Sequence, residues 1–319
     1  ANRRLLLREA QAQPVVVIFE DLHWVDAETQ ALLDSLVASL PAARLLMLVN
    51  YRPEYQHIWG SKTYYTQLRL DALPAESAGE LLEGLLGSDP GLAPLKALLT
   101  ERTSGNPLFL EESVRTLVET RALTGARGAY RLVQPVEAIQ VPATVQSILA
   151  SRIDRLPLDD KRLLQSAAVI GKDVPFALLQ GIAGLSEEDL RRGLAHLQAA
   201  EFLYEKNLFP DLEYTFKHAL THDVAYGSLL LDRRRDLHPK VMDTIEAPHA
   251  DRPVEQIERL AHHAFRVEVW TKAVGYLRQA AGKALARSAN REAVTYLEQA
   301  LAALAHLPES RQTMELAID

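Results

Sequence analysis

Two short apolar runs near the N-terminus predict neighbouring strands of a parallel sheet. They cover residues 14–19 and 44–50, and neither alternates with polar residues as a half-exposed strand would. The segment between them carries apolar residues at helical spacing: Leu32, Leu33, Leu36, Val37 and Leu40. Strand, helix and strand in this order predict a βαβ unit whose strands are buried on both faces.

Helical periodicity dominates the remaining sequence. It predicts helices over residues 3–12, 27–40, 75–86, 92–102, 159–170, 175–182 and 186–199, and a further helix that begins at Val141. Short strands are predicted over residues 67–73, 201–205 and 213–216. Residues 124–141 are predicted to form a loop or a small hairpin with residues 130–133 as one arm. Helices followed by a two-stranded wing are typical of a winged-helix domain.

A motif recurs in the Ala-rich helical region beyond residue 253. Lys272-Ala-Val-Gly-Tyr-Leu-Arg-Gln-Ala280 is echoed by Glu292-Ala-Val-Thr-Tyr-Leu-Glu-Gln-Ala300, and small residues alternate with large ones in both copies. This pattern predicts stacked helix pairs of the tetratricopeptide type. Because a solenoid buries its core between neighbours, we expect the last helix, which ends by Pro308, to expose an apolar face.

Two carboxylates follow the first strand directly. Glu20 and Asp21 lie where a parallel sheet collects its ligands, at the carboxyl end of a strand. Adjacent carboxylates repel each other, so a divalent cation or an ordered water would explain the pair. The alternative is purely structural: the acids at this strand end cap the helix that begins near Ala27, a role for which Asp26 is well suited.

The whole segment Pro14-Val-Val-Val-Ile-Phe-Glu20-Asp21-Leu-His23-Trp24-Val-Asp26 resembles the Walker B segment of signal-transduction ATPases with numerous domains (STAND). The resemblance is greatest to those attached to bacterial adenylate/guanylate cyclases and large transcriptional regulators. It implies that Glu20 holds Mg²⁺, directly or through water, and that Asp21 polarises the attacking water. ATP or ADP with Mg²⁺ would be the cofactors of the intact protein.

The second strand ends in Asn50-Tyr51-Arg52-Pro53-Glu54. This position is similar to sensor 1 of the same family, which implies that Arg52 reaches the terminal phosphate. The alternative is an exposed loop arginine paired with Glu54.

The string Gly105-Asn106-Pro107-Leu108-Phe109-Leu110-Glu111-Glu112 joins two predicted helices. A glycine that ends one helix and a proline in the first turn of the next account for it structurally. The string also resembles the Gly-x-Pro lid motif of the family. By that resemblance Gly105 and Pro107 are cofactor-binding residues near the adenine.

A histidine follows the predicted wing in Phe216-Lys-His218-Ala-Leu-Thr-His222-Asp223-Val-Ala-Tyr226. The pattern resembles the winged-helix histidine motif of STAND switches, which implies that His218 contacts the ADP β-phosphate. The alternative is a histidine that satisfies backbone groups at a helix start. His218 and His222 have metal-ligand spacing, but the segment lacks the glutamate of a zinc protease, which disfavours zinc.

Composition narrows the class of protein. The 319 residues carry a net charge of −7, which gives no global attraction to nucleic acid or anionic membranes. Cysteine is absent, which excludes disulfides and thiolate sites and is compatible with a cytoplasmic location. Arg233-Arg234-Arg235 lies between Asp232 and Asp236, so a solvated helix surface is favoured over a DNA-reading face. We expect no membrane partner.

A phosphate cradle of the form Gly-x4-Gly-Lys-Ser/Thr is missing from the sequence. Gly60-Ser61-Lys62-Thr63 lacks the upstream glycine and lies in a polar loop. We therefore expect the P-loop upstream, in a longer protein of which this chain is a fragment. The fragment alone should bind nucleotide weakly and be inactive as an ATPase.

The predicted fold is mainly α, with a partial α/β P-loop ATPase domain followed by a helical lid, a winged helix and an α-solenoid of tetratricopeptide type. The expected domains are residues 1–73, 74–140, 141–247 and 248–319. The resemblance implies a nucleotide-dependent signalling switch that controls a linked effector, such as a cyclase or DNA-binding head, and binds protein partners through its repeat. Two alternatives are a non-enzymatic interaction scaffold with a degenerate ATPase remnant and a winged-helix DNA-binding regulator.

Overall fold

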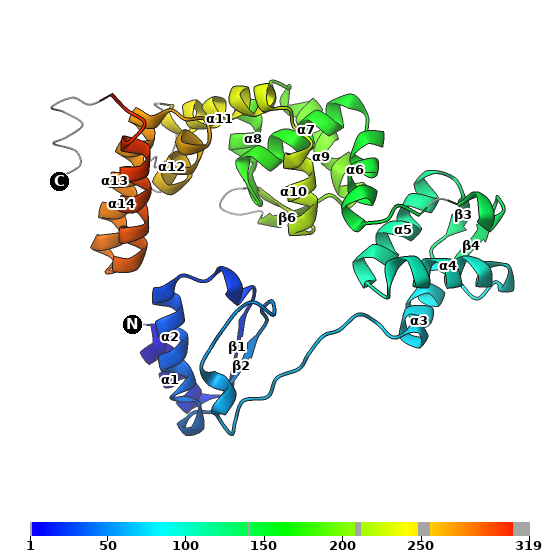
Figure 1. The fold of residues 1–319 in the computed structure, drawn as a ribbon, viewed down its shortest axis with the longest axis horizontal. Coiled ribbons are helices and arrows are strands. Elements are labelled where there is room, and N and C mark those ends of the chain that lie inside the picture. The colour runs from blue at the N-terminus through cyan, green and yellow to red at the C-terminus, as the bar shows by residue number, and fades with distance from the viewer. Residues whose placement is uncertain (1, 140, 208–211, 248–255, 309–319) are drawn as a thin grey trace. The chain divides into compact units, whose positions relative to one another are not determined.

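The computed structural model describes residues 2–139, 141–207, 212–247 and 256–308 (Figure 1). The chain divides into two compact units. Unit 1 combines Ala1–Arg69 with Asp251–Asp319, and unit 2 is Leu70–Ala250. Each unit is described by itself below.

The N-terminal part of unit 1 is a βαβ unit, as predicted. Its elements are α1 (Asn2–Ala12), β1 (Val15–Phe19), η1 (Leu22–Trp24), α2 (Ala27–Val37), η2 (Leu40–Ala42), β2 (Leu45–Val49) and η3 (Trp59–Ser61). The strands are parallel, with Val15 opposite Leu45 and Phe19 opposite Val49. Asp26 caps α2, since its side chain accepts a hydrogen bond from the Thr29 N–H at 2.6 Å.

The prediction that both faces of these strands are buried was wrong. Burial alternates along β1 and β2, and one face presents four aliphatic side chains that are about half exposed or more: Val16, Ile18, Leu46 and Leu48. The opposite face contributes to a core around Leu22, Leu33 and Trp59. In the described part of unit 1, nothing covers the aliphatic face, which is why the continuous apolar run is not matched by continuous burial.

The predicted strand over residues 67–73 is also absent. From Lys62 to Pro74 the described chain forms neither helix nor strand, and Leu68 and Leu70 are 83% and 93% exposed. A strand forms only where a neighbouring strand satisfies its backbone groups, and the described residues offer none to this segment.

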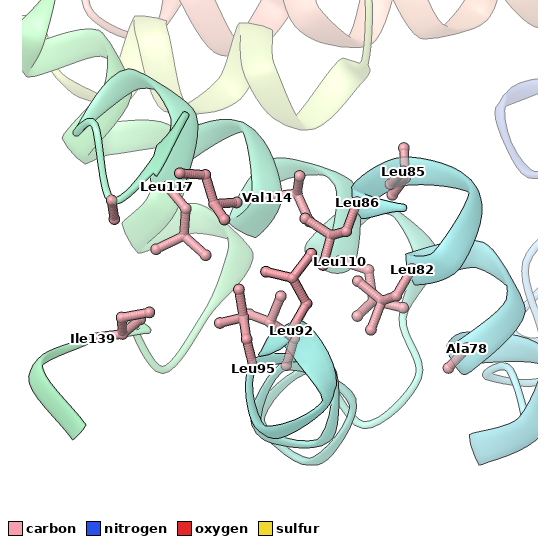
Figure 2. Close-up of a cluster of buried hydrophobic side chains, with 13 residues drawn as sticks. Ala78, Leu82, Leu85, Leu86, Leu92, Leu95, Leu110, Val114, Leu117 and Ile139 are labelled. Carbon is pink, nitrogen blue, oxygen red and sulfur yellow. The ribbon is translucent and has the colours of Figure 1, made fainter. Parts of the chain in front are cut away.

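Unit 2 begins with a helical module that has its own core, and we call this module the lid after the prediction for residues 74–140. The lid contains α3 (Ala75–Leu86), η4 (Pro90–Leu92), α4 (Ala93–Thr103), α5 (Pro107–Glu119), β3 (Leu123–Ala126), β4 (Ala129–Leu132) and η5 (Val136–Ala138). Leucines from the three helices point toward one another in Figure 2, among them Leu82, Leu95 and Leu110, each fully buried. The predicted hairpin is present as β3 and β4, which pair antiparallel.

Gly105 joins the start of the lid to the loop before α5. The Leu73 N–H donates to the Gly105 carbonyl oxygen at 2.9 Å. Gly105 has φ +73°, and a Cβ on this residue would lie 2.1 Å from the Leu73 carbonyl oxygen. Only glycine fits this backbone conformation and this close approach together.

The rest of unit 2 has a winged-helix arrangement. It contains α6 (Val145–Arg155), α7 (Leu158–Ile170), β5 (Asp173–Pro175), α8 (Phe176–Ala183), α9 (Glu187–Ala199), β6 (Leu203–Asn207), β7 (Glu213–Phe216), α10 (Ala219–Gly227) and α11 (Leu231–Glu246). The sheet has three strands in the order β5-β7-β6.

Two details of this region differ from expectation. The strand β5 was not predicted, because three residues are too few for a hydrophobic period. The helix α6 begins at Val145 rather than Val141, since the Thr144 hydroxyl caps it by accepting from the Ser147 N–H at 3.1 Å.

Three helices of the predicted repeat type complete unit 1: α12 (Ile257–Arg266), α13 (Trp270–Ala286) and α14 (Asn290–Leu304). The two copies of the motif lie on α13 and α14, and both first alanines, Ala273 and Ala293, are buried. Val274 of α13 is 3% exposed, whereas its equivalent Val294 of α14 is 52% exposed. The predicted apolar face on the last helix is thus confirmed. Among the described helices, none is sufficiently long and apolar to cross a membrane.

We expect Gly105→Ala to lower the free energy of unfolding by about 1–3 kcal/mol, because alanine is strained at φ +73° and its Cβ meets the Leu73 carbonyl. Gly79→Ala is the matched control: Gly79 lies inside α3 with open space around its Cβ position, so alanine should raise stability by about 0.5–1 kcal/mol. Urea unfolding measures both. Equal stability of the two variants would contradict the assigned role of Gly105.

Candidate functional site

The carboxyl ends of β1 and β2 are tied together by Asn50. Its backbone N–H donates to the Phe19 carbonyl at 3.1 Å, and its carbonyl accepts from the Leu22 N–H at 3.0 Å. Its side-chain oxygen accepts from the Asp21 N–H at 2.7 Å. The structure therefore brings Glu20 and Asp21 to the same sheet edge as the segment that carries Arg52, as the parallel arrangement predicted.

Asp21 adopts a left-handed backbone conformation, with φ 56° and ψ 44°. This conformation is uncommon for residues other than glycine, although aspartate tolerates it better than most. Asn50 and the fully buried Leu22 hold it in place. Strained residues of this kind concentrate at functional sites. Sequence reasoning assigned no role to Asn50, although an amide directly after a strand at such an edge is a usable signal.

Arg52 is exposed and lies in a turn in which the Tyr55 N–H donates to its carbonyl at 3.0 Å. Tyr51 and Tyr55, on either side of this turn, are anchored in a cluster of aromatic side chains. The Tyr51 hydroxyl lies 2.6 Å from the Tyr65 hydroxyl and 3.0 Å from Nε2 of His57. The position of Arg52 thus depends on a well-packed loop rather than on a strand.

The aromatic cluster is attached to α2 through Trp59. The indole N–H donates to the Asp34 carboxylate at 2.7 Å, and the Trp59 ring stacks on His57 with centroids 4.8 Å apart. Nδ1 of His57 accepts from the Trp59 backbone N–H at 3.1 Å, so this hydrogen bond requires the neutral ring. Burial lowers the pKa of His57 accordingly, and burial together with the Tyr51 hydrogen bond raises the pKa of Tyr65 to about 12.

Within the described residues, no group of three or more histidine, aspartate or glutamate side chains is arranged to hold a metal. Mg²⁺ is commonly bound by one or two carboxylates, with waters and substrate phosphates completing its octahedron. Glu20 and Asp21, both exposed at the sheet edge, fit that limited donor set.

In unit 2, the Gly-Asn-Pro string forms the start of α5. The preceding helix α4 ends at Ser104, which is left-handed with φ 50°. The Asn106 side chain caps α5 by accepting from the Phe109 N–H at 3.0 Å, and Pro107 occupies the first turn. Gly105 and Pro107 therefore lie together at the N-terminus of a helix, where the backbone favours anions.

His218 is the N-cap residue of α10. Its Nε2 atom is buried, and among the described residues it has no hydrogen-bond partner. Burial and the neighbouring Lys217 lower the pKa of His218, whereas the carboxylates Glu112 and Glu111 act in the opposite direction. The ring is therefore an unsatisfied polar group beside helix α5 of the lid. The other histidine, His222, is satisfied by the Ala168 carbonyl at 3.0 Å.

A network of charged side chains joins α5 to the winged helix; we call it the junction clamp. Arg152 of α6 is 1% exposed and bonds Glu112, Glu119 (2.8 Å) and the Ala200 carbonyl (2.9 Å). The other members are Arg115, Glu201 and Lys217. Arg155 pairs with Glu119 at the exposed edge of this network and is not counted as a member. An arginine in an amphipathic helix is normally exposed, so the sequence did not indicate this network.

The basic run on α11 is engaged locally. Arg233 pairs with Asp236 at 2.8 Å. Arg234 donates to the Gly227 carbonyl at 3.1 Å and lies 4.5 Å from the centroid of the Tyr226 ring. These contacts fit the solvated helix surface that was favoured over a DNA-reading face.

Comparison with known proteins identifies the fold. No family model matches the chain. An uncharacterized protein of Rhizobium meliloti (strain 1021) is 28% identical over 315 residues, which is 96% of this chain and 30% of that protein. The crystal structure of a Signal Transduction ATPase with Numerous Domains (STAND) protein with a tetratricopeptide repeat sensor, from Pyrococcus horikoshii, matches with a TM-score of 0.51 and 11% identity. The match covers 98% of this chain and 47% of that one.

The chain has a fold of this STAND and tetratricopeptide-repeat kind. It spans less than half the length of either protein. The mainly helical architecture with small sheets agrees with the predicted fold class.

The left-handed backbone of Asp21 predicts an order of stability among variants. We expect Asp21→Gly to be more stable than Asp21→Ala by about 1–2 kcal/mol, because glycine alone adopts φ 56° without a Cβ clash. Both variants remove the carboxylate, so the comparison isolates the backbone. Chemical unfolding measures the difference, and a more stable alanine variant would rule out this conformation.

The lowered pKa of Glu201 leads us to expect that acid destabilises the folded chain. Its hydrogen bond to Arg115, assisted by Lys217, lowers its pKa from 4.5 to about 2. A carboxyl whose pKa is lowered on folding stabilises the folded state above its unfolded pKa, and that contribution disappears as the pH falls from about 4.5 toward 2. Thermal unfolding between pH 6 and 3 should therefore show a smaller decrease in melting temperature for Glu201→Gln than for the unmodified chain.

Proposed function

We propose that this chain is part of a nucleotide-dependent signalling switch, in which binding and hydrolysis of ATP control a linked effector. The observation that carries the proposal is the edge formed by Asp21 and Asn50. There an acid in a strained conformation lies at the carboxyl ends of parallel strands and is fixed by a side chain of the neighbouring strand. The likeness in fold to a STAND protein supports it.

In this proposal Glu20 holds Mg²⁺, directly or through water, and Asp21 orients and polarises the water that attacks the terminal phosphate. Arg52 contacts that phosphate. Mg²⁺ supplies neutralisation of the phosphate charge when it is bound. The exposure of Glu20 and Asp21 at the sheet edge leaves both carboxylates accessible to such ligands.

We also propose three residues of unit 2 as nucleotide ligands, on the strength of their sequence motifs. Gly105 and Pro107 at the start of α5 would contact the base, and the free Nε2 of His218 would donate to the ADP β-phosphate. A buried imidazole nitrogen that lacks a partner has a desolvation cost, which a phosphate oxygen would offset.

A P-loop is also required, and we propose that it belongs to a segment preceding this chain. The aliphatic face formed by Val16, Ile18, Leu46 and Leu48 supports this proposal, because parallel sheets are normally covered on both faces. That segment would cover the face and bring the P-loop to the same sheet edge. The effector would be a further domain, of the cyclase or transcriptional-regulator type.

The repeat helices would recognise a protein partner. A cavity of about 670 Å³ lies among α12, α13 and α14 and is lined by aromatic side chains, including Phe265, Trp270 and Tyr296. Aromatic side chains provide large contact areas at protein interfaces. The tetratricopeptide repeat sensor of the Pyrococcus horikoshii protein supports the same role.

The test compares Mg-ATP binding and hydrolysis by the full-length protein with those by residues 1–319. We expect turnover only in the full-length protein. There Asp21→Asn should lower kcat by about 10²–10⁴-fold while nucleotide binding persists, because the variant loses only the base that acts on water. Glu20→Gln should raise the Mg²⁺ concentration needed for half-maximal activity.

Glu28→Gln provides the matched control, since Glu28 is an acid in the first turn of α2 to which the proposal gives no chemical role. Its turnover should equal that of the unmodified protein. Intact turnover in both Asp21→Asn and Glu20→Gln would overturn the assigned roles. A full-length protein without any ATP turnover would favour an interaction scaffold.

A further inference from the structure

The lid and the winged helix share a contact made by buried charges. Arg152 is 1% exposed and Glu112 is 3% exposed, and the two are in direct contact. The other two nitrogens of the Arg152 guanidinium donate to Glu119 and to the Ala200 carbonyl. The guanidinium also lies 4.7 Å from the centroid of the Phe202 ring. This one side chain therefore contacts the lid and the winged helix simultaneously.

Buried ion pairs are weak evidence for stability, because removing both charges from water costs about as much as their attraction returns. In some proteins they instead specify one arrangement among several. A change of geometry that kept the junction closed would leave Arg152 and Glu112 buried with poorly matched partners. The clamp consequently favours one geometry of the junction over all others.

The same contacts lead from Arg152 to His218. Ala200 and Phe202 flank Glu201, which pairs with Arg115 of the lid at 2.5 Å and with Lys217. The Lys217 N–H donates to the Phe202 carbonyl at 3.1 Å. Since Lys217 directly precedes His218, the backbone at the histidine is attached to the residues on which the Arg152 guanidinium rests.

We propose that Arg152 is a positioning residue for His218: through the junction clamp it makes the lid and the winged helix one rigid body and holds the histidine against α5. The groups that face His218 are Lys217 from its own strand end and Glu111, Glu112 and Arg115 from α5. The proposal rests on the proposed function only for the role of His218 toward nucleotide. The rigidity itself is a property of the chain without nucleotide.

The rigidity can be measured in the 319-residue chain, which has no cysteine of its own. Nitroxide labels at Glu101→Cys of α4 and Glu188→Cys of α9 would report the distance between lid and winged helix, since both positions are exposed. Pulsed electron paramagnetic resonance should give a single narrow distance distribution. Arg152→Met, of similar length but without charge, should broaden it.

Arg155→Met is the matched control on the same helix. Arg155 also pairs with Glu119, at 3.2 Å, but it is 36% exposed, and among the described residues its hydrogen bonds go to Ser151 and Glu119 rather than to the turn at Ala200. Its loss should leave the distribution narrow. Arg152→Lys keeps the charge but not the planar fork, so it should restore the narrow distribution only in part.

A second readout follows His218 directly. Its imidazole resonance, assigned by comparison with His218→Gln, should titrate below 6.5 in the unmodified chain and closer to 6.5 in Arg152→Met, because water then reaches the ring. Arg155→Met should not move it. A folded Arg152→Met chain with an unchanged distance distribution and an unchanged His218 titration would overturn the proposal.

If Arg152→Met does not fold, as judged by circular dichroism, the distance measurement is made on Glu119→Gln instead. Glu119 is 33% exposed, so the neutral amide should be tolerated while it weakens the clamp from the lid side. A broadened distance distribution supports the proposal, and an unchanged one overturns it. Neither readout needs ATP, so an absence of ATP turnover would count against the proposed function alone.

Discussion

The buried guanidinium of Arg152 is the contact on which the arrangement of unit 2 depends. The lid has a complete leucine core of its own, and the winged helix buries Phe202 and Phe216 within its own three-stranded sheet region. What fixes their orientation is a directional set of hydrogen bonds to one planar cation, which tolerates far less variation in geometry than apolar packing does.

Unit 1 shows the opposite design at the strand ends, where backbone and amide groups dominate over ion pairs. Asn50 uses its N–H, carbonyl and side-chain oxygen to connect β2 to the residues after β1. The aromatic loop from Tyr51 to Tyr65 then holds the turn at Arg52 against α2. The candidate chemistry thus rests on a preorganised edge, and this preorganisation exists before any ligand is bound.

Sequence reasoning located most elements, because their periodicity is local. It found the parallel strands, the order of the helices, the cap at Asp26, the proline in the first turn of α5, and the exposed face of α14. It failed where long-range contacts decide the outcome. The solvent exposure of Ile18 depends on what covers the sheet, the short strand β5 depends on β7, and the burial of Arg152 depends on a glutamate forty positions earlier in the chain. The left-handed Asp21 likewise depends on Asn50 of another strand.

The backbone hydrogen bond from the Leu73 N–H to the Gly105 carbonyl marks the point at which the chain enters the lid. The lid begins at this hydrogen bond. The residues before it form neither helix nor strand, so no backbone pairing fixes their number. Insertions or deletions near the exposed Leu68 would change the length of this connection while leaving the Leu73–Gly105 hydrogen bond in place. Changes in the length of this segment should therefore be tolerated without changes in the parts of the chain that it joins.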